Sequence, residues 1–334
     1  MFNITKKITI KRDPKKYLSF PDIIKSPKTN NRLFLIYREG DSHHPVWSNL
    51  VLWVSNDNGE TWEELCKFRS DLKQHDCVWN CPRLSYIGDY LYIICDQKSG
   101  TKERFAKFST IFFISNDEGH EFTKKEIPFP GMVPDKIISF KNKLFCANHK
   151  IKSTKGDLIQ LVSWSRDNGI TWYDTNIMAQ DKYFQFCEAS IVNMGDHLVA
   201  YLRENSGHKR HIYTVTSKDG IHWTNPLQLP IFGQRVTALK DEDKNEMIVG
   251  AYRDTDAPDF SIMNPKLKVS VFEHNLINGD ITLSKIDWEY LENQYHFGYT
   301  GMVRIASNKY AIAYYVKRTA INPYIKLAII NKVE

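Results

Sequence analysis

Ser55-Asn-Asp57-Asn-Gly59-Glu-Thr61-Trp62 is the stretch that decides the fold, because it returns as Ser165-Arg-Asp167-Asn-Gly169-Ile-Thr171-Trp172. A third copy, residues 115–122, ends in Phe, and a fourth, residues 217–223, is one residue shorter. The four copies, called Asp boxes below, begin 60, 50 and 52 residues apart and follow apolar runs such as LVLWVS. In such a turn Asp accepts backbone N–H groups, Gly supplies a positive φ, and Trp packs onto the sheet. The boxes therefore predict structural β-hairpin turns.

A second, fainter repeat occurs six times: an apolar run, a turn, and another apolar run that ends in a polar residue. The six runs begin at Phe20-Pro21-Asp22, Cys81-Pro82-Arg83, Val133-Pro134-Asp135, Cys187-Glu188-Ala189, Gln234-Arg235-Val236 and Gly298-Tyr299-Thr300. Units of 47 to 64 residues built from short alternating strands have the size of propeller blades. The repeat therefore predicts an all-β fold, a six-bladed β-propeller of four-stranded antiparallel blades, with residues 1–334 as a single domain.

The starts of the six runs should lie together, because the innermost strands of a propeller line its central channel. This places a ring of polar side chains at one mouth of the channel: Asp22, Arg83, Asp135, Glu188, Arg235 and Tyr299. A ring of this kind at the end of a funnel is a candidate binding site. The alternative is that these charged groups pair with one another and only hold the blades together.

Composition excludes several classes of protein. Aromatic residues make up 13% of the 334 residues, more than a disordered chain carries, and no apolar run reaches the roughly 20 residues of a membrane-spanning helix. The net charge of +6 is mild and forms no dense basic stripe, so we expect neither a nucleic-acid nor a membrane partner. The N-terminus lacks a signal-peptide pattern, and the six cysteines are scattered, which favours a cytoplasmic protein with reduced thiols and no metal or cofactor.

Together the boxes and the six-fold repeat resemble the sialidase (neuraminidase) superfamily of BNR-repeat propellers, over nearly the whole chain. Three segments carry the resemblance further. Phe186-Cys-Glu188, followed by Tyr201-Leu-Arg203, is similar to the segment with the catalytic Glu and one arginine of a carboxylate-binding triad. Gly298-Tyr299-Thr300-Gly301 is similar to the segment with the nucleophilic Tyr. Tyr37-Arg38-Glu-Gly-Asp41-Ser-His43-His44 lies where sialidases keep another triad arginine and the acid/base Asp.

The resemblance implies a retaining exo-glycosidase acting on an acidic sugar, sialic acid or a relative, with a glycan as its substrate. Tyr299 would be the nucleophile, Glu188 its base and Asp41 the acid/base. The chemistry fits these residue types, because a neutral phenol avoids the repulsion between a carboxylate nucleophile and an anionic sugar. A phenol with a pKa near 10 needs a base, and arginines bind a carboxylate through two hydrogen bonds.

The chain departs from the sialidase pattern in places that matter for the substrate. The first triad arginine stands in an Arg-Ile-Pro motif, and here that stretch reads Ser19-Phe20-Pro21. The third triad arginine has no clean match either, and Arg253 and Arg235 are its substitutes. The predicted substrate-binding set also contains Arg38, Arg83, Arg203, His43 and His44.

Two other functions fit the same residues. In a propeller-type polysaccharide lyase, Tyr299 or a histidine (His43, His44 or His149) would remove the proton beside a uronate carboxylate. A glycan-binding propeller without catalysis would explain the altered arginine set. The sequence leaves the sugar, the linkage and the oligomeric state open.

Overall fold

Strands make up the whole of the regular structure in the part of the chain that is described. The computed structural model of the protein describes residues 1–70, 77–99, 107–127, 131–151, 157–206, 210–255, 268–287, 298–317 and 322–333. Within these ranges the chain forms 23 strands and no helix. Accordingly, no helix there is long and apolar enough to cross a membrane. Short apolar runs rich in Ile, Val, Phe and Tyr, separated by Gly, Asn and Asp turns, account for this content.

Four of the sheets contain four antiparallel strands each. One is formed by β2 (Tyr17–Lys25), β3 (Leu33–Gly40), β4 (Ser48–Ser55) and β5 (Glu63–Arg69). The next is formed by β6 (Cys77–Ile87), β7 (Tyr90–Ser99), β8 (Lys107–Ser115) and β9 (Thr123–Ile127). The third is formed by β10 (Ile137–Phe140), β11 (Lys143–Ile151), β12 (Leu158–Ser165) and β13 (Tyr173–Ala179). The last is formed by β21 (Thr300–Ala306), β22 (Lys309–Val316), β23 (Tyr324–Lys332) and β1 (Phe2–Lys11).

A seven-stranded sheet completes the ring. Its strands are β14 (Phe186–Asn193), β15 (Leu198–Glu204), β16 (His211–Ser217), β17 (Leu227–Lys240), β18 (Met247–Asp254), β19 (Lys268–Asn275) and β20 (Ile281–Asp287). The first part of β17 pairs with β16, and its second part, from Gly233 on, pairs with β18. The propeller of four-stranded antiparallel sheets is confirmed, but six separate blades are not supported. The reason is that β17, 14 residues long, joins two sets of strands into one continuous sheet.

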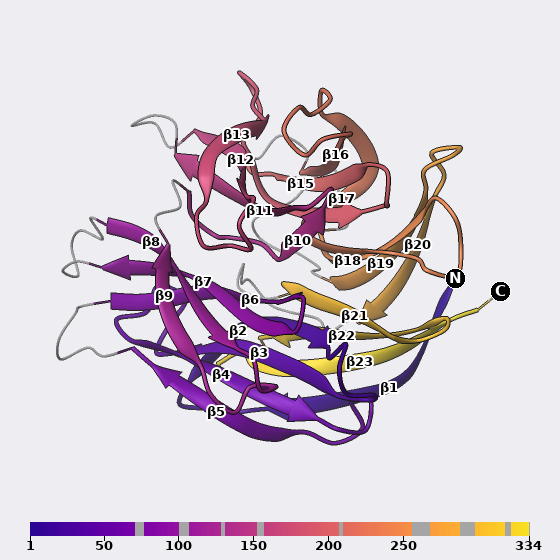
Figure 1. The fold of residues 1–334 in the computed structure, drawn as a ribbon. Helices are drawn as coiled ribbons and strands as arrows, with labels where there is room; N and C mark the ends of the chain where they lie inside the picture. The colour runs from indigo at the N-terminus through magenta and orange to yellow at the C-terminus, as the bar shows by residue number, and fades with distance from the viewer. Residues whose placement is uncertain are drawn as a thin grey trace.

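The sheets stand around a common centre, and the two chain ends meet (Figure 1). The first strand, β1, lies antiparallel to the last, β23, with Phe2 opposite Lys332. This pairing closes the ring through backbone hydrogen bonds, so the sheet that completes the propeller takes strands from both ends of the chain.

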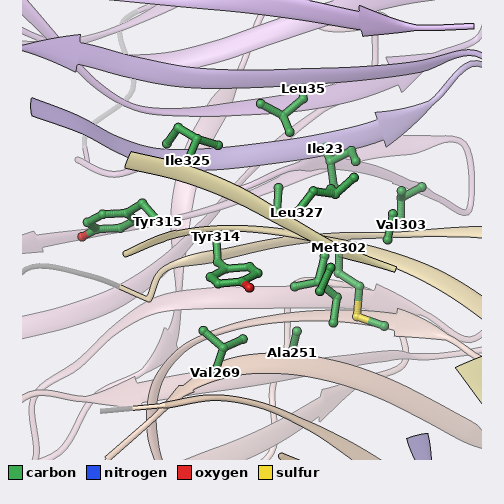
Figure 2. Packing of buried hydrophobic residues seen from close by; sticks show 14 of the residues in the cluster. Ile23, Leu35, Ala251, Val269, Met302, Val303, Tyr314, Tyr315, Ile325 and Leu327 are labelled. Carbon is green, nitrogen blue, oxygen red and sulfur yellow. The ribbon is translucent and has the colours of Figure 1, made fainter. Parts of the chain in front are cut away.

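Apolar side chains fill the space between neighbouring sheets. In Figure 2, Ile23 of β2 and Leu327 of β23 face Met302 of β21, and all three are fully buried. Val269 of β19 belongs to the same cluster, so three sheets meet there. Burying one such side chain contributes roughly 1.5–3 kcal/mol, which explains why the inner positions of these strands are almost all apolar.

The four Asp boxes form the same turn each time. In the first box Ser55 Oγ donates to Asp57 Oδ1 at 2.7 Å and accepts the Gly59 N–H at 2.8 Å. Thr61 N–H donates to Asp57 Oδ1 at 2.9 Å, and Trp62 Nε1 donates to the Gly59 carbonyl at 3.1 Å. The Ser and Gly bonds recur in the other three boxes, and each box glycine has a φ of 78° to 90°. The predicted hairpin turns are therefore confirmed.

Each Asp box lies at one end of its sheet, and the loops that approach the centre of the propeller lie at the other end. In the first sheet β4 begins after the loop 41–47 and ends at the box of residues 55–62. The 41–47 loop is part of the candidate site described below, so the boxes stand one strand length away from it. This distance supports a structural role for the boxes.

Candidate functional site

A kinked backbone marks the beginning of each of the six repeated runs. Residues with a left-handed φ stand at equivalent places: Phe20, Cys81, Val133, Glu188, Arg235 and Gly298, with φ between 48° and 79°. Register shifts in the strand pairing bracket four of them, as between Cys187 and Ser190 in β14. A β-bulge of this kind turns a side chain away from its regular direction. Non-glycine residues in this conformation are strained, and such strain collects at functional sites.

Tyr299, Glu188 and Arg203 form one hydrogen-bonded cluster at the centre. Tyr299 Oη donates to Glu188 Oε1 at 2.9 Å. Arg203 Nη1 donates to Tyr299 Oη at 2.6 Å and to Glu188 Oε2 at 2.8 Å. Tyr299 and Glu188 are 7% and 8% exposed, so these contacts lie in a largely dry environment. The structure thus brings together the predicted nucleophile, its predicted base and one predicted arginine.

The charges of the cluster are set by its neighbours. Burial raises the pKa of Glu188, but Arg203 and Arg235 outweigh burial and hold that pKa at about 2. Burial raises the pKa of Tyr299 to about 12, although Arg203 opposes the shift. At neutral pH the site therefore holds a carboxylate that accepts a hydrogen bond from a protonated phenol.

Arginine side chains surround one side of Tyr299. A cavity of about 220 Å³, called the arginine pocket below, is lined by His43, Arg203, Asn205, Arg210, Gln234, Arg253, Tyr299 and Tyr315. The guanidinium of Arg253 lies 5.0 Å from the centroid of the Tyr299 ring and also hydrogen-bonds Gln234. Gly298 makes this approach possible, since a Cβ there would lie 3.1 Å from Arg253 Cγ. Three guanidinium groups around one cavity suit an anionic ligand.

Tyr299 also lines a second cavity, whose lining combines apolar, aromatic and charged side chains. This cavity of about 250 Å³, called the loop pocket below, is lined by Phe20, Arg38, His43, His44, Pro45, Val78, Asn80, Cys81, Lys98, Val133, Glu188 and Tyr299. Tyr299 and His43 line both cavities. Glu188 is the one carboxylate that the described residues contribute to either cavity, and it lines the loop pocket, so the stronger preference for an anion belongs to the arginine pocket.

Arg38 lines the loop pocket but is held by the 41–47 loop. Its Nη2 donates to the carbonyls of Ser42 at 3.0 Å and His43 at 3.2 Å, and its Nη1 donates to Asn80 Oδ1 at 2.8 Å. The side chain is 1% exposed and makes no ion pair with any described residue. These contacts hold the 41–47 loop against Arg38, which still lines the loop pocket.

Within the 41–47 loop, Asp41 and the two histidines differ in whether they line the cavities. Asp41 is exposed, its Oδ1 accepts the Val46 N–H at 3.0 Å, and it lines neither of the two cavities. His43 and His44 do line the loop pocket, with ring centroids 4.7 Å apart. The loop therefore brings histidines, not its carboxylate, to Tyr299.

The remaining predicted ring residues form a buried ion cluster beside the cavities. Arg235 Nη2 lies 2.6 Å from Asp135 Oδ1, and Arg83 Nε lies 3.4 Å from the same oxygen. Asp22 pairs with Lys136 at 3.1 Å and accepts the Leu84 N–H. Neither Arg83 nor Arg235 lines either cavity, and both are at most 1% exposed. The contacts of these residues match the alternative that the sequence left open, in which the charged groups pair with one another and hold inner strands together.

His149, a candidate base for a lyase, is 6% exposed in β11 and lines neither cavity. Burial lowers its pKa to about 4, so the imidazole is neutral. Within the described ranges no group of three His, Cys, Asp or Glu side chains is arranged to hold a metal ion.

Sequence reasoning missed several lining residues. Arg210, Asn205 and Gln234 line the arginine pocket, and Asn80 and Lys98 line the loop pocket. One signal was available for two of them. Alternate residues of a strand share a face, and Asn205 and Lys98 each lie two positions beyond a polar residue that ends an inner run, Arg203 and Asp96. Arg210 offers no such pattern.

Comparison with known proteins shows where this fold recurs. Residues 89–252 match the family model of the BNR repeat-like domain. A Dyadobacter fermentans protein of unknown function superposes with a TM-score of 0.82, at 18% identity over 99% of both chains. No curated protein sequence matches the chain.

Two sialidases share the fold as well. A Trypanosoma rangeli sialidase, in complex with 2,3-difluorosialic acid as a covalent intermediate, has a TM-score of 0.70 at 12% identity, over 99% of this chain and 59% of its own. The NanB sialidase from Streptococcus pneumoniae has a TM-score of 0.68 at 12% identity, over 99% of this chain and 70% of its own. The chain thus spans less than two thirds of the trypanosomal enzyme. In class, the protein is a β-propeller with the fold of the sialidases and a BNR repeat-like segment.

Proposed function

We propose that this protein is a retaining exo-glycosidase that hydrolyses the glycosidic bond of an acidic sugar, sialic acid or a related acid. Tyr299 is the nucleophile and Glu188 is its base. The observation that carries the proposal is the cluster in which Tyr299 Oη donates to Glu188 while Arg203 donates to both. A nucleophile within hydrogen-bond reach of a base that a third group orients is the usual arrangement for covalent catalysis.

The arginine pocket explains why a tyrosine would attack. A sugar with a carboxylate at its anomeric carbon repels an anionic nucleophile, and a neutral phenol avoids that repulsion. Arg203, Arg210 and Arg253 line the cavity beside the phenol, where they can bind the carboxylate. Arg210 takes the place in this set that the sequence assigned to Arg235.

Substrate binding also prepares the base. Arg203 helps to hold the pKa of Glu188 at about 2, which makes the carboxylate a weak proton acceptor. A substrate carboxylate bound to Arg203 shares that positive charge, so the pKa of Glu188 rises and the transfer of the Tyr299 proton becomes easier. The site is therefore built to react only when an anion is bound.

The shared fold adds support of a general kind. The trypanosomal sialidase forms a covalent intermediate with a sialic acid derivative, which is the kind of intermediate that a tyrosine nucleophile would form here. We infer that the seven-stranded sheet works as two blades joined by β17, because its two halves each carry one of the six kinked inner positions, Glu188 and Arg235. Residues 1–334 then act as one catalytic unit.

The test is turnover by the full chain on fluorogenic sialosides, a nonulosonic acid glycoside and uronic acid polymers, with Tyr299→Phe. We expect release of the sugar with retained configuration, read by NMR of the first product, and a loss of roughly 10³-fold or more in the variant. The matched control is Tyr37→Phe, since Tyr37 is a buried tyrosine of β3 whose Oη accepts Trp53 Nε1 away from both cavities. An ultraviolet-absorbing product would instead indicate a lyase.

A second candidate is a glycan-binding propeller without turnover, and one observation favours it. Ser19 stands where the sialidase pattern has its first arginine, and the ring of the next residue, Phe20, lies 5.3 Å from that of Tyr299. An aromatic ring beside arginines suits the binding of a sugar face. Binding of a sialoside with no release by the folded protein would support this function over the hydrolase.

A further inference from the structure

Beyond its nucleophile and base, a retaining glycosidase needs a group that gives a proton to the leaving oxygen and later takes one from water. We propose that His43 is this acid/base residue, an inference that rests on the proposed function. In this arrangement a histidine replaces the carboxylate that the sequence pattern puts in the 41–47 loop.

The position of His43 fits the role. It lines the loop pocket and the arginine pocket, a property that it shares with Tyr299. The Phe20 ring lies 5.8 Å from the His43 ring and 5.3 Å from the Tyr299 ring, measured between centroids. His43 and the nucleophile therefore both neighbour the Phe20 ring and both line the two cavities, so the scissile bond would lie where these cavities meet.

The surrounding side chains hold His43 in place. Arg38 donates to the His43 carbonyl through both Nη atoms at 3.2 Å, and Arg38 is itself 1% exposed. Tyr17 Oη lies within hydrogen-bond distance of His43 Nδ1, at 3.3 Å. Arg38 thus holds the backbone of His43, and Tyr17 holds its ring. Proton transfer in a transition state requires a positioned side chain of this kind.

The other candidates in the loop fit less well. Asp41 is exposed, bonds the Val46 N–H and lines neither cavity. His44 is exposed and lines only the loop pocket. His43 alone of the three reaches both cavities.

The two steps balance with His43 in this role. In the first, Tyr299 Oη bonds to the anomeric carbon and its proton passes to Glu188, while the bond to the leaving oxygen breaks and that oxygen takes a proton from the His43 imidazolium. In the second, the neutral imidazole takes a proton from water, and the water oxygen bonds to the anomeric carbon. The bond to Tyr299 then breaks, and the phenolate recovers its proton from Glu188.

The experiment compares His43→Asn with Asp41→Asn in the full chain, on an alkyl and a 4-nitrophenyl glycoside of the same sugar acid. Asparagine keeps a polar atom near the Nδ1 position that faces Tyr17 but transfers no proton. We expect His43→Asn to lower kcat by about 10²–10⁴-fold on the alkyl glycoside, which needs protonation of its leaving oxygen. On the 4-nitrophenyl glycoside the burst of nitrophenol should persist, and azide should raise turnover and give a glycosyl azide of retained configuration.

Asp41→Asn should stay within about threefold of the parent protein on both substrates, as a loop residue outside both cavities should. The inference is overturned if Asp41→Asn shows the leaving-group dependence and azide rescue while His43→Asn does not. An equal loss on both glycosides in His43→Asn, without azide rescue, also overturns it. Failure of the proposed function looks different, because the parent protein and Tyr299→Phe would then be equally inactive on both substrates.

Discussion

The two ends of the sheets are built by different rules. At the Asp-box end, four turns repeat one set of hydrogen bonds between residues at most four apart, such as Gly169 N–H to Ser165 Oγ. At the site end, Tyr299 reaches Glu188 across 111 residues and Arg203 across 96, and no such cluster recurs among the described residues. The comparison teaches that the repeat builds the frame and that the departures from the repeat build the site.

Among the variants that test the difference between the two ends, we expect the largest effect on kcat from replacing Glu188. Replacing it with Gln keeps a group that can bond Tyr299 Oη but removes the base and the partner of Arg203. We expect kcat to fall by about 10²–10⁴-fold, measured on the substrate that the parent protein turns over best.

A matched control exists in the first sheet. Glu39 of β3 is also buried and ion-paired, to Lys16 at 3.0 Å and Lys67 at 3.3 Å, but it lines neither cavity. Glu39→Gln should lower the melting temperature with kcat nearly unchanged. Comparable losses of kcat in both variants would show that ion pairing, and not proton transfer, is what Glu188 supplies.

Local repetition explains what the sequence could predict. The boxes carry their own turn chemistry, so the hairpins and the propeller class follow from residues such as Asp57 and Gly59. The closure of the ring by β1 and the joining of strands by β17 depend on partners far away, and no local pattern reports them.

The same reasoning applies to the site. Glu188 and Tyr299 stand at repeated positions near the starts of the inner runs, and Arg203 stands at the repeated polar end of a second run, so their meeting could be predicted. The outward turn of Asp41 could not, because it depends on the hydrogen bond to Val46 and on how Arg38 holds the loop. The burial of Arg83 and Arg235 against Asp135 depends on which neighbouring blade offers a carboxylate.

A smaller effect is expected at the Asp-box end. Asp57→Ala removes the acceptor of Ser55 Oγ and Thr61 N–H, and losing these bonds should lower the free energy of unfolding by about 1–3 kcal/mol. In thermal unfolding each kcal/mol corresponds to roughly 1–2 °C for a chain of this size. The kcat should not change, because the box lies at the far end of β4.

The control for this variant is a turn aspartate outside the boxes. Asp280, between β19 and β20, accepts one side-chain hydrogen bond, from Asn278 Nδ2 at 2.7 Å. Asp280→Ala should change the free energy of unfolding by less than about 0.5 kcal/mol. A loss of kcat in Asp57→Ala at full occupancy of the folded state would contradict the separation of the two ends.

The smallest expected effect is on the pH dependence of stability. It is tested by comparing one aspartate at the site end of the sheets with one at the Asp-box end. Asp96, near the site end of β7, is 1% exposed, and burial raises its pKa to about 7. Its Oδ1 accepts the Val133 N–H at 2.6 Å, and its Oδ2 has no hydrogen-bond partner among the described residues. In the box, burial raises the pKa of Asp57, but hydrogen bonds from Thr61 and Ser55 hold that pKa at about 2.

These opposite shifts predict opposite pH behaviour. The folded pKa of Asp96 lies above its unfolded value of about 3.9, so the stability it contributes is complete below that value and is lost as pH rises through 7. Asp96→Asn, which can still accept from Val133, should therefore gain on the parent protein in melting temperature between pH 5 and pH 8, by about 2 °C or more. Asp57→Asn should differ from the parent by a constant amount over that range, because Asp57 is ionised throughout in both states. If the Asp96→Asn curve ran parallel to that of the parent as well, the carboxyl of Asp96 would already be ionised at pH 5, and the charge difference between the two ends would have to come from Glu188 and the arginines alone.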